Sequence, residues 1–130
     1  MTDALSAVDI AAFGLLDAGI VGATVHQHTP ADQVPPVVII GDLDEVYSLG
    51  GKAASRNRAG TLSIVVVTEG EERAPCSALL DQVEQLLDRK TVTAAGFNVS
   101  FEFRRSSSVL AEDGLGYIGL AELKIYSIAA

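Results

Sequence analysis

The chain of 130 residues lacks tryptophan and has a single cysteine, Cys76. One cysteine cannot form a disulfide within the chain, and this fits a reducing compartment. An uninterrupted apolar run of about 18 residues, which a membrane-spanning helix needs, is also missing. Asp9 and Asp17 interrupt the first apolar segment, and Asp3 stands where a secretory leader carries basic residues. We therefore expect no membrane partner.

Positive charge is scarce as well. Lys and Arg number 9 against 17 Asp and Glu, so the formal net charge is −8. An acidic chain repels phosphate, which argues against non-specific binding of nucleic acid but fits a passage through which DNA slides without being held. Hydrophobic residues make up 48% of the chain and charged residues only 20%. This surplus predicts burial against other subunits, with a monomer rich in Ala and Val as the alternative.

No sequence motif of catalysis is present, since Gly-x-Ser-x-Gly, a Walker loop and His-Glu-x-x-His are all missing. The segment 114–119 has the letters of the dinucleotide fingerprint, Gly-x-Gly-x-x-Gly, but it leads into a predicted strand and not into a helix. Its glycines are better explained by a bent hairpin and a close approach of another segment. We expect no catalytic residues and no cofactor.

Two histidines and the cysteine are the remaining candidates for chemistry. His26 and His28 lie on one face of a predicted strand and, with Asp32, could bind a metal ion. No third fixed ligand is evident, so we predict no metal site, and the histidines are expected to be solvated or at an interface. Cys76 lies at a predicted helix N-terminus, where a thiol pKa falls, but no base stands near it in the sequence. A packing role is favoured over a nucleophile.

Apolar periodicity predicts two helices, over residues 4–18 and 74–89. The second has the clearer stripe, and Pro75 suits its first turn. Strands are predicted at 20–27, 37–48, 61–68, 97–104 and 117–128, the second of them long and bent. This order predicts an α+β fold. We expect one mixed, mainly antiparallel sheet of about five strands, with two helices packed on one face, in a single domain spanning 1–130.

Two long segments between these elements, 49–60 and 104–114, are predicted as a mobile loop and as a polar loop or extended hairpin tip. They hold five of the nine basic residues, namely Lys52, Arg56, Arg58, Arg104 and Arg105. Long loops in a compact domain are uncommon unless they are functional. These residues are therefore candidates for an interface with an acidic partner surface, such as a neighbouring copy of the chain. The alternative is two solvated loops.

The order of elements resembles a known family. An Ala- and Leu-rich helix comes first, then a short strand at Val25-His26 and a loop with Pro30. The segment 34–41, Val-Pro-Pro-Val-Val-Ile-Ile-Gly, then leads through the basic loop to the strand 62–67 and the helix 78–87. With the two closing strands, this pattern resembles the tail completion, or tail terminator, proteins of long-tailed bacteriophages and gene transfer agents over nearly the whole chain.

The resemblance implies a structural protein of the virion tail, assembled in the cytoplasm of a bacterial host. It implies a homohexameric ring that caps the head-proximal end of the tail tube and offers the head-tail joining surface. The implied partners are the tail tube protein and head-tail connector proteins, and DNA passes through the lumen without specific binding. Alternatives are a head-tail connector or stopper, a minor tail protein, or, in another class, a small α+β enzyme or ligand-binding module.

Overall fold

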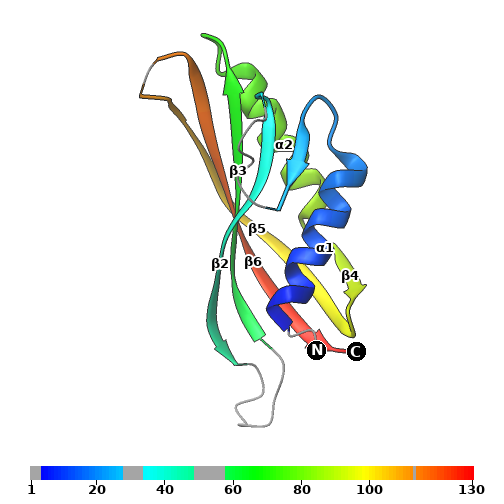
Figure 1. Ribbon diagram of the computed structural model, residues 1–130. Helices are drawn as coiled ribbons and strands as arrows, with labels where there is room; N and C mark the ends of the chain where they lie inside the picture. Colours follow the sequence, from blue (N-terminus) through cyan, green and yellow to red (C-terminus); the bar gives the residue numbers. More distant parts are fainter. Residues whose placement is uncertain (1–3, 28–33, 49–57, 113) are drawn as a thin grey trace.

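The computed structural model describes residues 4–27, 34–48, 58–112 and 114–130. Figure 1 shows the helices beside a long, strongly twisted sheet. Both helices were predicted nearly to the residue. The elements in chain order are α1 Ala4–Gly19, β1 Thr24–His26, β2 Val37–Ser48, β3 Arg58–Glu69, α2 Ala74–Leu87, β4 Thr91–Ala94, β5 Phe97–Leu110 and β6 Gly116–Ala129.

The sheet has six strands in the order β1-β2-β3-β6-β5-β4. All neighbours are antiparallel except β1 and β2, which run parallel, so the prediction of a mixed, mainly antiparallel sheet is confirmed. The predicted number of about five strands was too low by one, because β4 was missed. This short strand pairs with the start of β5 across a tight turn at Ala95 and Gly96, whose φ values are 51° and 86°.

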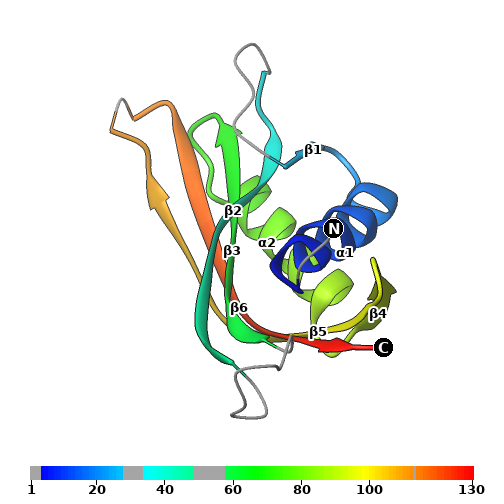
Figure 2. The same cartoon turned by 60° about the horizontal axis from the view of Figure 1, so that its bottom comes forward.

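Both helices cover the same face of the sheet, which curls around them (Figure 2). Along α2, the apolar stripe turns inward, and five residues are buried, namely Cys76, Leu79, Leu80, Val83 and Leu87. On α1, buried residues recur with helical spacing: Ala7, Val8, Ala11, Ala12 and Leu16. The helices and the inner sheet face together enclose the core. None of the helices in the described residues is long and apolar enough to cross a membrane.

The central strands alternate in burial over residues 61–69 of β3 and 118–128 of β6, as period-two strands do. Leu62, Ile64 and Val66 of β3 enter the core. They pair with Leu123, Ala121 and Gly119 of β6. The other face of both strands points away from the helices. This division fixes which side chains remain available to a partner.

The segment 104–114 was predicted as a polar loop or an extended hairpin tip, and the second alternative is correct. Strand β5 continues to Leu110 and pairs with β6 down to Tyr117. The register shifts between Phe103 and Arg105, as it does at a β-bulge. The extra residue changes which side chains of β5 point to the core and which point away from it. Strand β3 likewise begins at Arg58 and not at residue 61, so residues 58–60 of the predicted loop belong to a strand, and residues 49–57 lie outside the described residues.

Candidate assembly surface

Three of the five predicted interface residues lie in described parts of the structure, and all three are on strands. Lys52 and Arg56 lie outside the described residues. Arg58 is the half-buried first residue of β3, opposite Ser127 of β6. Arg105 lies opposite Glu122, five residues back along β6. At about 3.4 Å per residue this separates the two positions by about 17 Å along the strand. The structure therefore does not bring Arg58 and Arg105 into one basic cluster.

Arg104 and Arg105 follow each other at the bulge of β5, and both side chains are well exposed. The Arg105 guanidinium lies 3.7 Å from the Glu122 carboxylate, and that of Arg104 lies 4.0 Å from Glu102. Exposed ion pairs of this kind contribute about 0–1 kcal/mol, so either arginine can exchange its partner at little cost. Both are accessible to a carboxylate on another molecule.

One face of the sheet is turned away from the helices, toward the left in Figure 2, and a group of apolar residues shares it. Cross-strand pairs place its members together: Val37 faces Val67, which faces Ile118, which faces Val109. A second row runs from Ile39 through Val65 to Leu120. We call these seven residues the outer-face patch: Val37, Ile39, Val65, Val67, Val109, Ile118 and Leu120.

Exposure within the outer-face patch rises from β2 to the tip of β5. Val37 and Ile39 are nearly covered, whereas Ile118 is 42% and Val109 is 57% exposed. Neither helix packs on this face. A groove of about 650 Å³ borders the patch, lined by the apolar residues Ile39, Val65 and Leu120 and by the acidic residues Asp42 and Glu122. A mixed apolar and acidic lining is typical of surfaces that contact proteins.

Sequence reasoning predicted a surplus of apolar residues but did not locate it. The available signal was the run Ile64-Val65-Val66-Val67, which is apolar on both faces of a strand. A strand of this kind is buried on both sides. Neither helix packs on the other face, and Ile118 and Val109 remain exposed there in the described part of the chain.

Cys76 is fully buried at the start of α2. Burial raises the pKa of its thiol, against smaller opposing effects of the Thr68 hydroxyl and the Arg73 guanidinium. A buried thiol with a raised pKa is a poor nucleophile. A Cβ added at Gly119 would lie 2.9 Å from the Cys76 sulfur and 2.9 Å from a Leu80 methyl group. The sulfur therefore fills the space that this glycine leaves, which supports the packing role.

The remaining candidates lie only partly in the described residues. The Thr24 hydroxyl and Nε2 of His26 lie 2.9 Å apart and share a hydrogen bond, while His28 and Asp32 fall outside the described residues. Within the described ranges, no three metal-ligating side chains lie together. The segment 114–119 leads into β6 and not into a helix. A side chain at Gly116 would collide with the Thr68 carbonyl oxygen, so close packing explains this glycine.

A curled sheet with helices on one face and a partly exposed apolar patch on the other suits a subunit of a larger assembly. Residues 15–126 match the family described as tail completion protein gp17. The chain belongs to this family of phage tail structural proteins.

Comparison with solved structures supports the fold. A chain from the virion of a native gene transfer agent particle superposes with a TM-score of 0.81 at 16% sequence identity. The match covers 93% of this chain and 94% of that one. No curated protein sequence matches the chain. The sequence-based recognition of the tail completion family is thus confirmed by the family match.

Proposed function

We propose that this protein caps the head-proximal end of a phage-type tail tube as a ring of six copies and provides the surface to which the filled head joins. The family match over residues 15–126 carries this proposal, because it makes the chain a tail structural protein. The fold shared with a chain of a gene transfer agent virion supports it. Assembly would take place in the cytoplasm of a bacterial host, and the mature location is the virion tail.

A closed ring requires head-to-tail contacts, in which each copy presents one surface and the complement of that surface. The outer-face patch supplies apolar area for such contacts or for contact with the tube protein. Arg58, Arg104 and Arg105, with Lys52 and Arg56, supply positive charge on a chain whose net charge is −8. Because the subunit is acidic, the lumen would let DNA pass without holding it.

Capping can be tested on growing tubes. Purified tail tube protein of the same particle is allowed to polymerise with and without this protein, and tube lengths are measured by electron microscopy. We expect added protein to stop elongation and to appear as a ring at one end only. Binding to tailless heads with no effect on tubes would instead indicate a head-tail connector or stopper. If the protein neither changes tube length nor binds to tailless heads, the proposal is contradicted.

A further inference from the structure

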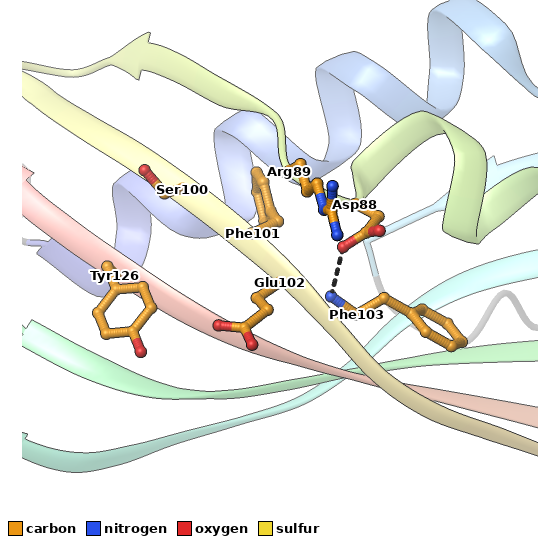
Figure 3. A pocket seen from close by; sticks show the side chains of 7 residues that line it. All are labelled: Asp88, Arg89, Ser100, Phe101, Glu102, Phe103 and Tyr126. Atoms are coloured by element: carbon orange, nitrogen blue, oxygen red, sulfur yellow. Dashed lines mark hydrogen bonds between the residues drawn. The ribbon is translucent and has the colours of Figure 1, made fainter.

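Half of the β5 edge is already paired within the subunit. The backbone N–H of Phe103 donates to the Asp88 carboxylate at 2.9 Å, as Figure 3 shows. The N–H of Arg89 donates to the Phe101 carbonyl at 2.9 Å, and the Phe101 N–H donates to the Lys90 carbonyl at 3.0 Å. The chain leaving α2 thus occupies the edge of β5 as far as Phe103. These bonds also show that Phe101 and Phe103 direct their backbone groups away from β6.

Beyond the bulge, the same edge is open. Along an antiparallel strand, every second residue directs its backbone N–H and C=O toward the same neighbouring strand, and the residues between them direct theirs to the other side. After the register shift between Phe103 and Arg105, the backbone groups that point away from β6 belong to Ser106, Ser108 and Leu110. These three residues lie opposite Ala121, Gly119 and Tyr117 of β6. In the described part of the chain, no strand pairs with β5 on this side beyond Ser100. A groove of about 270 Å³ separates Ser106–Ser108 from α2. This segment therefore presents N–H and C=O groups to solvent.

A second open edge lies on β2, at the other end of the strand order. Strand β1 pairs only with Val37–Ile39. From Ile40 to Ser48, the paired neighbour within the described residues is β3 alone. This edge carries Asp42 and Asp44, both exposed. Asp42 lines the same groove as Glu122, and Asp44 is opposite Thr61, so both point to the outer face of the sheet, as Arg105 does.

We propose that the open edge of β5 in one copy pairs with the open edge of β2 in the next copy, so that one sheet continues from subunit to subunit. This inference rests on the proposed ring and names its interface. Exposed edges are templates for strand addition, which unsatisfied backbone groups drive. Strands β2, β3, β6 and β5 alternate in direction, so a β5–β2 contact between copies is antiparallel, like the pairs inside each sheet.

The open edges of β5 and β2 carry side chains of opposite charge. Arg104 and Arg105 precede the open segment of β5, and Asp42 and Asp44 lie on the open segment of β2. Opposite charges on the two edges favour head-to-tail contact, whereas two copies of the same edge would repel. In Figure 1 the open part of β2 lies at the bottom and that of β5 at the top left. Pairing them staggers neighbouring copies along the strands, and a sheet that closes into a ring needs stagger.

The test uses two full-length charge-reversed chains, Arg104→Glu with Arg105→Glu, and Asp42→Lys with Asp44→Lys. Each chain alone brings like charges together at every interface. We expect the concentration for half-assembly to rise at least tenfold for each, measured by analytical ultracentrifugation. Mixed in equal amounts, the two chains can alternate around a ring with opposite charges at each contact. We therefore expect the mixture to assemble within about threefold of the wild-type concentration.

A backbone variant tests the hydrogen bonds independently of charge. Ser108→Pro removes an outward N–H at an edge, a place where sheets accept proline. For the folded Ser108→Pro chain, we expect the concentration for half-assembly to rise at least tenfold. The control Ser108→Ala should assemble at the wild-type concentration. Circular dichroism verifies that both are folded. If Ser108→Pro does not fold, the mixture of the two charge-reversed chains tests the edge pairing by itself.

The outcomes separate this inference from the proposed ring. A wild-type chain that stays monomeric, alone and with tubes, overturns both. Wild-type rings together with charge-reversed or Ser108→Pro chains that assemble equally well leave the ring standing and overturn the edge pairing. Failure of the mixture to recover, while each reversed chain is folded and monomeric, also overturns it.

Discussion

Val83→Asp is expected to lose about 4 kcal/mol of the free energy of unfolding, because it places an unpaired carboxylate in the core. Val83 lies in the middle of the inward stripe of α2 and is fully buried. For a chain of this length, that loss corresponds to a fall in Tm of roughly 12–20 °C. Thermal melting followed by circular dichroism measures it.

Ala78→Asp is the matched control on the same helix. Ala78 is exposed near the start of α2, where a carboxylate remains hydrated. Its Tm should stay within about 3 °C of wild type, as surface changes usually cost at most about 0.5 kcal/mol. Equal melting of the Val83→Asp and wild-type chains would show that the inward face of α2 is misassigned.

Ile118→Asp is expected to prevent assembly onto tubes while leaving the subunit folded. Ile118 is 42% exposed in the outer-face patch, between Val67 and Val109. In the free subunit a carboxylate there remains hydrated, so stability should change by about 1 kcal/mol or less. In the assembled particle it would be desolvated without a partner, which costs at least about 2 kcal/mol per copy. Tube capping at wild-type protein concentration should then be lost.

Ile128→Asp provides a close control. Ile128 belongs to the same strand, points to the same face and is 43% exposed, but it pairs with Asn98 beyond the patch. This variant should cap tubes as wild type does. If both variants cap tubes normally, the outer-face patch is not a contact surface. If both fail, the contact extends over the whole length of β6.

The helices and their inward faces could be predicted because their signals are local. Pro75 and the Leu79-to-Leu87 stripe set the position of α2 without reference to the rest of the chain. The alternation from Phe97 to Phe103 likewise identified the first half of β5. The same local signals predicted the order of these elements, and the family resemblance rested on that order; the structure adds only β4 to it.

The rest depends on pairing between distant segments. The stretch Arg104–Ser108 is polar and has weak strand propensity, yet it is held in β5 by its register with Glu122–Gly119 of β6. Strand β4 was missed because its turn begins with Ala95, which is not a typical left-handed residue. Neither open edge can be found before the strand order is known. For the same reason, the sequence does not show that the basic candidates Arg104 and Arg105 lie at a bulge beside an open edge.

The central claim is self-association into a closed ring, and the mass of the wild-type particle in solution tests it most directly. The chain has a mass of 13.5 kDa. Light scattering over a range of concentrations, with and without short tail tubes, should give a species of about 81 kDa, or six copies on each capped tube end. A mass of one chain at every concentration, together with no binding to tubes, would contradict the account.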